Sequence, residues 1–325
     1  MTQQSATLRR IGIVADTRGY HVVLGATGGA GRALVAELAR QGRRVRAVSR
    51  RAPEPWPQGV EAITTDILQS DDVRKACRDA AVVYHAANVP YAQWQQVLPA
   101  MTESVIAAAS AADAVLVVVD NLYMYGPPSG PMTEDSPRRA SGPKGQLRAR
   151  LEEMFLAAHI TGRVGVAIGR GSDFYGPHAN SAATMLVIQP ALRGKTASWL
   201  GSLDAPHTLT YLPDFARSLV TLGTNARAWG EVWHIPSGPP VTGRTFIAEV
   251  FEALGQPPRM RRLGRGMLTL AGLFNRQIRE AREVLYQFEQ PFVMDTSKFE
   301  RTFGGSVTPL REGVRQTIAA LQSTL

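Results

Sequence analysis

The stretch VLVVVDNLYMYGP, residues 115–127, places polar side chains directly after a run of apolar residues. Five apolar residues typical of strands come first, and Asp120, Asn121, Tyr123 and Tyr125 follow them. Such a run indicates a buried strand of a parallel sheet, and open α/β sheets bind their ligands where the strands end. The amide and the phenols could therefore serve in hydrogen bonding and proton transfer. Asp120 is expected to hold the loop by accepting hydrogen bonds from backbone N–H groups.

Alternating strands and helices must position this stretch. Short apolar runs predict strands, and amphipathic patterns between them predict helices. The strands are expected at 21–25, 45–49, 81–87, 115–119 and 164–169, and the helices at 31–42, 70–80, 94–106 and 145–159. This βαβ alternation predicts an α/β protein with a Rossmann-type, doubly wound parallel sheet, because right-handed crossovers bring the carboxyl ends of the strands to one edge.

The pattern changes after about residue 176, where loops lengthen, Pro and Gly cluster, and helical patterns dominate. We expect residues 1–176 to form a dinucleotide-binding Rossmann domain. Residues 177–325 are expected to form a smaller, mostly helical substrate lobe, some segments of which return to the Rossmann sheet. This lobe is expected to complete the substrate pocket.

The composition is that of a globular protein, since 44% of the residues are hydrophobic and 19% are charged. No stretch is long enough to span a membrane, the first residues do not resemble a signal peptide, and the single cysteine excludes an intrachain disulfide. We therefore expect a cytoplasmic protein. The net charge of +9 comes mostly from arginines spread along the chain, and the six histidines show no metal-ligand spacing. These features predict a small-molecule substrate rather than a metal, nucleic acid or membrane, and they leave a homodimer open.

The most informative motif is VVLGATGGAGRALV, in which Gly25, Gly28 and Gly31 recur at every third position. The motif begins as a strand ends and finishes as a helix begins. Glycines there permit a tight turn and let the backbone approach a pyrophosphate, which the free N–H groups of the helix start then bind. Thr27 and Gly29 belong to the same turn. The motif predicts a dinucleotide site.

The end of the second strand indicates which dinucleotide binds. An acidic residue here would bind the ribose 2′-hydroxyl of NAD, but the sequence has Ser49, Arg50 and Arg51 instead. A guanidinium can pair with a 2′-phosphate, so these residues favour NADP over NAD. The alternative is that they are surface arginines of an arginine-rich chain.

Together with the glycine motif, several segments resemble the extended short-chain dehydrogenase/reductase superfamily, in the branch of NAD(P)-dependent sugar-nucleotide epimerases, dehydratases and related reductases. They are TTDIL with Asp66 and Ile67, His85–Ala87, MYGP at 124–127, GRGSDFYGP at 169–177, LTYLPDFARSLV and FVMDTSKFERTFG. The resemblance spans most of the chain. It implies that Asp66 and Ile67 hold the adenine ring and that Ala86 and Ala87 lie along the cofactor.

The chain departs from this family at two positions. The family usually has Ser or Thr where this chain has Asn121, and its Tyr-x-x-x-Lys motif is reduced here to Ala140 and Lys144. The resemblance therefore implies that Lys144 still contacts the nicotinamide ribose, whereas the tyrosine that exchanges a proton with the substrate is missing. Asn121 can donate a hydrogen bond to a substrate oxygen but cannot transfer a proton.

Another tyrosine could replace the missing acid. Tyr123 lies two residues after Asn121, in a segment that tends to face the substrate in the family, and it is our candidate for the proton donor. Tyr91 and Tyr175 are also expected to line the substrate pocket, while Tyr125 is expected to be architectural. Ordinary packing, with a bonded hydroxyl, is the alternative for these tyrosines.

Three functions remain open. The first is an NADP-dependent oxidoreductase, acting on a small carbonyl or hydroxyl substrate through an atypical active site with Tyr123, Asn121 and Lys144. The second is a nucleotide-sugar epimerase or dehydratase, which the missing tyrosine disfavours more strongly. The third is a non-catalytic protein that binds or senses NADP(H), which Ala140 supports and Lys144 opposes.

Overall fold

The computed structural model describes residues 19–51, 55–274, 279–280 and 282–323. The chain forms two compact units that alternate along the sequence. Among the described residues, unit 1 consists of those between 19 and 120, Leu147–Arg170 and Ala216–Trp233, and unit 2 consists of Asn121–Gln146, Gly171–Phe215 and those between 234 and 323. The sequence predicts one domain boundary, after residue 176, and this boundary stays a prediction.

Unit 1 is built on a seven-stranded sheet with the order β10-β6-β5-β4-β1-β2-β3. Its neighbours from β6 to β3 pair in parallel. The order reverses between β1 and β4, which is where doubly wound sheets bind their ligands. The Rossmann-type α/β fold is therefore confirmed. The strands are β1 (Tyr20–Leu24), β2 (Val45–Ser49), β3 (Val60–Thr64), β4 (Ala80–His85), β5 (Val115–Asp120), β6 (Gly165–Arg170) and β10 (Glu231–His234).

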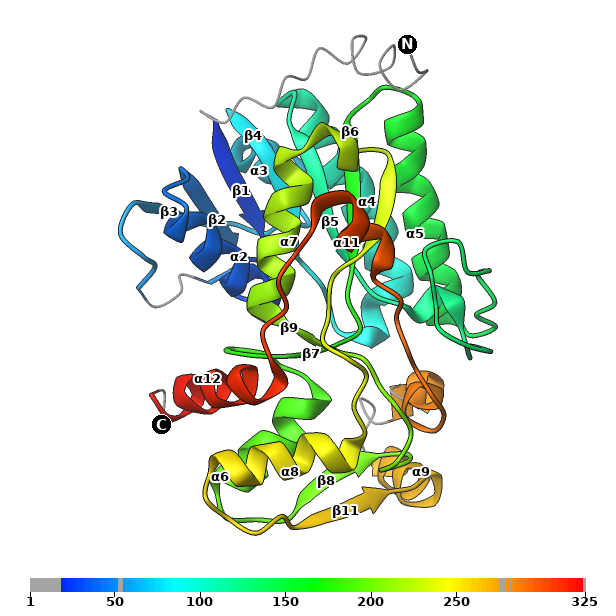
Figure 1. Ribbon diagram of the computed structural model, residues 1–325. Coiled ribbons are helices and arrows are strands. Elements are labelled where there is room, and N and C mark those ends of the chain that lie inside the picture. Colours follow the sequence, from blue (N-terminus) through cyan, green and yellow to red (C-terminus); the bar gives the residue numbers. More distant parts are fainter. Residues whose placement is uncertain (1–18, 52–54, 275–278, 281, 324–325) are drawn as a thin grey trace. The chain divides into compact units, whose positions relative to one another are not determined.

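Helices pack on this sheet in two groups. Figure 1 shows α2 and α7 in front of the sheet, and Gly223 of α7 lies close to the ring of Tyr84 in β4. The second group is formed by α3, α4 and α5, since α3 packs against α4 and Arg148 of α5 lies over the ring of Trp94 in α4. The helices are α2 (Gly29–Arg40), α3 (Ser70–Ala76), α4 (Trp94–Ala111), α5 (Pro143–Ile160) and α7 (Leu212–Thr224).

The apolar pattern explains most of these elements. Strands β1, β2, β4, β5 and β6 are buried along nearly their whole length, and each lies within two residues of the expected bounds. Strand β3 was not expected, because it is half-exposed and lacks an apolar run. After α2, Gly42 has a positive φ of 68°, the left-handed conformation that glycine commonly adopts just after a helix ends.

Unit 2 contains two small parallel sheets, β8 with β11 and β7 with β9, and several helices. Its core packs around Trp199, Phe246 and Phe251. The strands are β7 (Asp173–Tyr175), β8 (Ala197–Leu200), β9 (Leu209–Tyr211) and β11 (Met260–Leu263), and the helices are α6 (Gln189–Leu192), α8 (Gly243–Ala253), α9 (Arg265–Phe274), α11 (Ser297–Phe303) and α12 (Leu310–Gln322). Within the described ranges, no helix is both long and apolar enough to cross a membrane.

Candidate dinucleotide and substrate sites

The glycine motif forms a tight turn between β1 and α2 in unit 1. Gly25 follows the last residue of β1 and has a positive φ of 85°, a conformation that favours glycine. A Cβ atom at Gly25 would lie 2.6 Å from the backbone N of Ala87, and one at Gly31 would lie 2.2 Å from the carbonyl oxygen of Gly25. Both distances are too short for a side chain. The turn therefore requires glycine at these two positions.

The start of α2 is suited to binding an anion. Gly28 is the N-cap residue, no side chain caps the helix, and its first turn contains no acidic residue. Thr27 and Gly28 are exposed. The first backbone N–H groups of a helix lack intrahelical partners and carry the positive end of its dipole. The residues here fit the pyrophosphate of a dinucleotide, because the turn is free of side chains that would block it.

The end of β2 carries the residues expected to select the cofactor. Ser49 is buried and its hydroxyl donates a 2.6 Å hydrogen bond to the carbonyl oxygen of Arg51, whereas Arg50 and Arg51 are exposed. An exposed guanidinium beside the switch point is available to a phosphate.

The other residues expected to hold the cofactor also lie in unit 1. Asp66 follows β3 and accepts a 3.1 Å hydrogen bond from the backbone N of Leu68, so it shapes a turn, and Ile67 is buried. Ala86 continues β4 and donates from its backbone N to Leu24. Ala87 is the residue that Gly25 approaches. The contacts of these residues with a cofactor stay predictions.

Asn121 and Tyr123 begin the first segment of unit 2. The side-chain oxygen of Asn121 accepts a 3.0 Å hydrogen bond from the backbone N of Tyr123. This bond fixes the amide, so its NH₂ group is the one suited to donate to a substrate oxygen. Tyr123 is half-buried and begins a short 3₁₀ turn, Tyr123–Tyr125. Their catalytic roles stay predictions.

Tyr125 has an architectural role, as expected. Its hydroxyl lies 2.8 Å from Nε2 of His234, and Nδ1 of this histidine lies 3.0 Å from the carbonyl oxygen of Asp295. A carbonyl only accepts, so Nδ1 carries the proton of a neutral imidazole and Nε2 accepts from Tyr125. All three residues belong to unit 2, and the phenol is buried.

Ala140 fills the position of the missing tyrosine and is closely packed. Its backbone N donates to the carbonyl oxygen of Met124 over 3.2 Å. A Cβ atom at Gly126 would lie 3.0 Å from the Cα of Ala140, and one at Gly145 would lie 2.2 Å from its Cβ. The two glycines leave room for alanine between them.

Lys144 is buried and held by two glutamates of unit 2. Its Nζ lies 2.9 Å from a carboxylate oxygen of Glu280 and 2.8 Å from one of Glu283. The other carboxylate oxygen of Glu283 accepts a 2.7 Å hydrogen bond from the backbone N of Lys144. Burial lowers the pKa of Lys144, but the hydrogen bonds that its ammonium donates to Glu283 and Glu280, together with the negative charges of these carboxylates, outweigh burial and raise the pKa overall. A lysine paired in this way favours a neighbouring phenolate less than an unpaired lysine would. Its contact with a ribose stays a prediction.

The other two tyrosines differ in their surroundings. Tyr175 lies in the core of unit 2, where its ring packs against Tyr211 and Phe246. Burial raises its pKa, and Asp214 contributes. This burial favours packing over a substrate contact. Tyr91 of unit 1 is half-buried, and the edge of its ring meets Trp94.

Asp120 belongs to an ion-pair cluster that the sequence did not indicate. Its carboxylate accepts from Nε of Arg170 at 2.9 Å and contacts Arg148 at 3.5 Å, and Arg170 also pairs with Glu152. The expectation that Asp120 bonds backbone N–H groups is replaced by these ion pairs, because two guanidiniums reach the end of β5. No local motif could have indicated them, since Arg170 lies 50 residues away.

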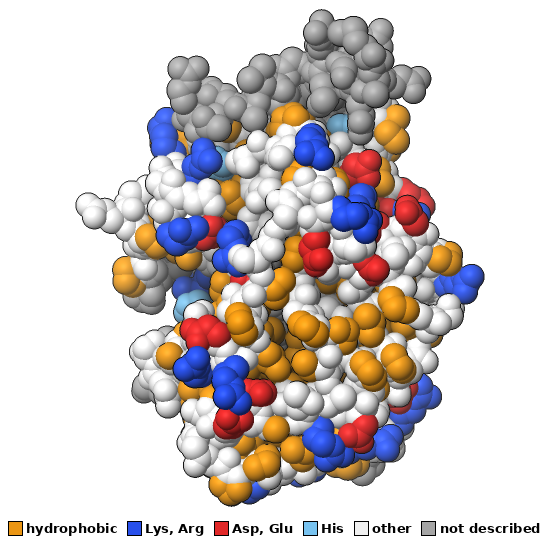
Figure 2. Space-filling model, viewed as in Figure 1, with side chains coloured by type: hydrophobic (Ala, Val, Ile, Leu, Met, Phe, Trp, Pro, Cys, Tyr) orange, Lys and Arg blue, Asp and Glu red, His pale blue; other side chains and the backbone are white. Residues whose placement is uncertain are grey.

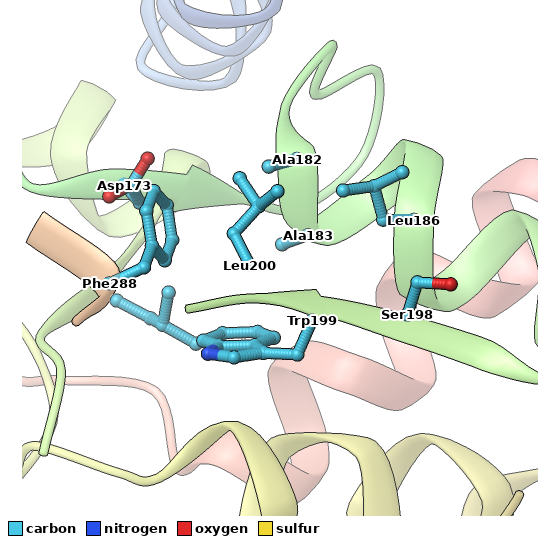
Figure 3. Close-up of a pocket in the computed structure, with 9 residues that line it drawn as sticks. Asp173, Ala182, Ala183, Leu186, Ser198, Trp199, Leu200 and Phe288 are labelled. Carbon is cyan, nitrogen blue, oxygen red and sulfur yellow. The ribbon is translucent and has the colours of Figure 1, made fainter. Parts of the chain in front are cut away.

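Unit 2 also contains a pocket that was not anticipated. Its walls come mainly from apolar residues, and Figure 3 shows Asp173 and Phe288 at one end, with Leu186 and Ser198 at the other. The carboxylate of Asp173 accepts from Nε2 of His207 at 2.8 Å. None of the residues proposed from the sequence lines this pocket.

Charge is mixed on the face drawn in Figure 2, where Lys and Arg side chains are interspersed with Asp and Glu. Among the residues that the structure describes, no group of three or more His, Cys, Asp or Glu side chains could hold a metal ion.

The sequence did not indicate Glu280 and Glu283 as partners of Lys144. Both lie more than 130 residues from Lys144, in a helical pattern without a motif.

Comparisons with curated proteins give a short match. Uncharacterized proteins of Mycobacterium tuberculosis (Rv2047c) and Mycobacterium bovis (Mb2073c) are each 40% identical to this chain over 65 residues, which is 20% of this chain and 8% of theirs. The match therefore covers a small part of the length of these relatives.

Solved structures match over nearly the whole chain. MoeE5 in complex with UDP-glucose and NAD is 24% identical with a TM-score of 0.76, over 94% of this chain and 99% of that one. UDP-glucuronic acid 4-epimerase from Bacillus cereus in complex with NAD is 21% identical with a TM-score of 0.76, over the same shares. At identities this low, the structural similarity establishes the fold alone.

The family itself follows from a family-wide sequence profile. The profile of the NAD dependent epimerase/dehydratase family matches residues 21–235, which is more than half of the chain. This match confirms the resemblance inferred from the glycine motif and MYGP. The chain belongs to the NAD dependent epimerase/dehydratase family.

Proposed function

We propose that this enzyme is an oxidoreductase that acts on a small carbonyl or hydroxyl substrate and prefers NADP to NAD. The observation that carries the proposal is the turn between β1 and α2, where Gly25 and Gly31 leave no room for a Cβ atom. Such a turn, followed by uncapped N–H groups, suits a pyrophosphate. A nicotinamide dinucleotide supplies or accepts hydride when bound.

The residues of unit 2 would carry out the proton chemistry. Tyr123 donates the proton to the substrate oxygen, and the amide NH₂ of Asn121 orients that oxygen. The bond between the Asn121 side-chain oxygen and the backbone N of Tyr123 ties these two groups together. Lys144 binds the ribose, which requires that Glu280 and Glu283 share it or release it.

Cofactor preference can be measured by titrating NADPH and NADH against the intrinsic fluorescence of the protein. A charge-assisted bond to the 2′-phosphate contributes about 1.5–3 kcal/mol, so NADPH should bind roughly ten- to a hundredfold more tightly. Arg50→Ala should erase most of this difference, and Arg74→Ala, at an exposed arginine on α3, is the control. Equal affinities, or tighter binding of NADH, would refute the NADP preference and leave an NAD enzyme.

The proton donor can be tested with Tyr123→Phe. General acid catalysis contributes about 10²–10⁴-fold, so this variant should lose that much turnover while its cofactor affinity holds. Tyr125→Phe is the matched control, because it removes a buried structural hydroxyl bonded to His234. The control should unfold more easily but turn over normally once folded. Normal turnover in Tyr123→Phe would assign the proton to another group.

A nucleotide-sugar epimerase or dehydratase is the second candidate. It is supported by the family and by the similarity to structures that hold UDP-glucose or are named as UDP-glucuronic acid 4-epimerase. Incubation of the protein with NAD and UDP-glucuronic acid, followed by chromatography of the sugars, distinguishes the two. A new sugar nucleotide would favour this candidate. Binding of NADP(H) without turnover of any substrate would instead favour the sensing role that Ala140 suggests.

A further inference from the structure

Two arginines near opposite ends of α2 differ in the groups that they contact. Arg40, at the end of the helix, pairs with the carboxylate of Glu37 at 2.7 Å. Arg32, the fourth residue of the helix, has no carboxylate partner in the part of the chain that the structure describes. Its Nε donates a 3.4 Å hydrogen bond to the carbonyl oxygen of Thr27 in the glycine turn. Because this acceptor is neutral, the positive charge of Arg32 stays available to an anion.

The guanidinium of Arg32 also contacts an aromatic ring. Trp56 lies between β2 and β3, and the central carbon of the guanidinium lies over its indole, 5.6 Å from the ring centroid. The face of an aromatic ring attracts a cation, and tryptophan does so most strongly. Both side chains are half-buried. Trp56 and the carbonyl of Thr27 together restrict the guanidinium, so its position is set before any ligand binds.

The glycine turn connects this arginine to the end of β2. The backbone N of Ala26 donates a 3.0 Å hydrogen bond to the carbonyl oxygen of Val48, as does that of the preceding residue. Thr27, which accepts from Arg32, directly follows Ala26. Arg50 comes two residues after Val48 and is exposed. Arg32 and Arg50 therefore approach the same end of the sheet, one from α2 and the other from β2, and both belong to unit 1.

The end of the second strand is the place where a dinucleotide-binding sheet distinguishes NADP from NAD. An acidic residue there binds the 2′-hydroxyl of the adenosine ribose, and an arginine accommodates a 2′-phosphate. A phosphate monoester carries nearly two negative charges at neutral pH, which is more than one guanidinium balances. A second guanidinium at the same end of the sheet would complete the charge balance, and its planar fork suits phosphate oxygens.

We propose that Arg32 binds the 2′-phosphate of NADP(H) together with Arg50, and that Trp56 is a positioning residue that holds the guanidinium of Arg32. Arg32 is then a further specificity-determining residue of the dinucleotide site. The inference rests on the proposed preference for NADP. It adds a residue from the first turn of α2 to the end of β2, where the sequence alone indicated Ser49, Arg50 and Arg51.

The test compares two probes that differ only in the 2′-phosphate, ADP-ribose and 2′-phospho-ADP-ribose, by isothermal titration calorimetry of the full chain. Both contain the pyrophosphate and lack nicotinamide, so hydride transfer does not enter the measurement. Arg32→Gln should weaken the phosphorylated probe roughly three- to tenfold, as expected for a partly exposed charge pair, and leave ADP-ribose unchanged. Arg40→Gln removes the same charge near the other end of α2 and should change neither affinity.

The other outcomes separate this inference from the preference for NADP. If wild type prefers the phosphorylated probe and Arg32→Gln binds it equally well, the inference fails while the preference stands. Equal weakening of both probes would assign Arg32 to the pyrophosphate, and an equal loss in Arg40→Gln would reduce the effect to net charge. Each of these results would overturn the role of Arg32. A wild type without any preference between the probes would refute the NADP preference itself, and the inference with it.

Trp56 is tested by whether it acts through Arg32. Trp56→Leu should weaken the phosphorylated probe about two- to fivefold, the range of an exposed cation–π contact. Trp56→Phe keeps an aromatic face and should retain most of the affinity. In a chain that already carries Arg32→Gln, Trp56→Leu should have no further effect, because the two residues act as one unit. Additive losses, or an equal loss of ADP-ribose binding, would overturn the positioning role.

Discussion

A buried cluster of ion pairs lies in each compact unit, and the two clusters differ in charge balance and exposure. In unit 1, Asp120 and Glu152 meet Arg148 and Arg170, so two acids face two bases. The side chains of Arg170 and Glu152 are fully buried. In unit 2, one lysine meets two glutamates, whose side chains are 30% and 21% exposed.

This difference separates a structural brace from a contact that can open. The unit 1 cluster ties the ends of β5 and β6 to α5, and removing Arg170 takes away the buried cation that Asp120 and Glu152 share. The unit 2 cluster carries an excess of negative charge and touches solvent, so water can replace a lost partner. The cation that is proposed to bind the ribose therefore belongs to the weaker of the two clusters.

The largest effect is expected from breaking the unit 1 cluster. Arg170→Gln leaves Asp120 and Glu152 buried without their shared cation, which should cost about 3–5 kcal/mol of unfolding free energy. Urea unfolding followed by circular dichroism measures this loss. Arg163→Gln is the control, since Arg163 pairs with Glu103 at an exposed position and its loss should cost at most about 1 kcal/mol. Equal losses would contradict the brace.

Acid should affect unit 1 through its buried histidines. Burial lowers the pKa of His85 to about 4, with Arg148 contributing, and burial lowers that of His21 to about 4, with Arg43 contributing. Because the pKa is lower in the folded protein, the histidines of the unfolded chain take up protons first as the pH falls. The stability that the neutral histidines contribute is therefore complete above about pH 6.5 and is lost as the pH falls toward 4.

Comparison of wild type with His85→Leu measures this loss. Removing one such histidine should flatten the fall in unfolding free energy between pH 7 and pH 4.5 by on the order of 2 kcal/mol. His178→Leu, at an exposed loop position of unit 2, supplies the comparison. An acid profile identical to that of wild type would show that His85 is not the group that titrates.

A smaller effect is expected from breaking the unit 2 cluster. Glu283→Gln removes one charged partner of the Lys144 ammonium and weakens the hydrogen bond from the backbone N of Lys144. The unfolding free energy should fall by about 1–3 kcal/mol. Glu280→Gln should cost less, because Glu283 accepts from both the ammonium and the backbone N of Lys144, whereas the backbone N of Lys144 does not bond Glu280. Urea unfolding of both variants tests this order. If Lys144 binds the ribose, both variants should also bind the dinucleotide at least as tightly as wild type.

The smallest effect is expected in alkali, and it sharpens the contrast between a lysine and an arginine cluster. The raised pKa of Lys144 means that its stabilisation is complete below the ordinary lysine pKa of about 10.4 and is lost as the pH rises through the folded value. The guanidiniums of unit 1 stay charged over this range. Amide hydrogen exchange above pH 10 should therefore accelerate around Lys144 before it does around Arg170. The reverse order would contradict the assignment.

Features of the fold that depend on local pattern could be predicted from the sequence. The strands β1, β2, β4, β5 and β6 are continuous apolar runs, and the turn at Gly25 and Gly31 needs glycine for reasons that its own neighbours supply. Strand β3 was missed because it is half-exposed. A local pattern reports burial and turn geometry, and β3 offers little of either.

The partners of the candidate site could not be predicted, because tertiary folding supplies them. The glutamates that hold Lys144 lie 136 and 139 residues away, and the two arginines that pair with Asp120 lie 28 and 50 residues away. Asp173 stands inside the segment GRGSDFYGP, yet nothing in that segment indicates His207. Pairings between residues so far apart in the sequence leave no signal that a spacing rule could detect.

The interleaving of the two units has a consequence for the order in which the chain can fold during synthesis. Six of the seven strands of the unit 1 sheet precede residue 171, so that sheet can form early. The segment 121–146 cannot reach its folded contacts as early, because their partners are synthesised later. Tyr125 bonds His234, Met132 bonds Val293 and Lys144 bonds Glu283. At ordinary elongation rates, the interval between the synthesis of Lys144 and that of Glu283 is on the order of 10 s. During that interval the segment lacks the tertiary contacts that hold it in the folded protein.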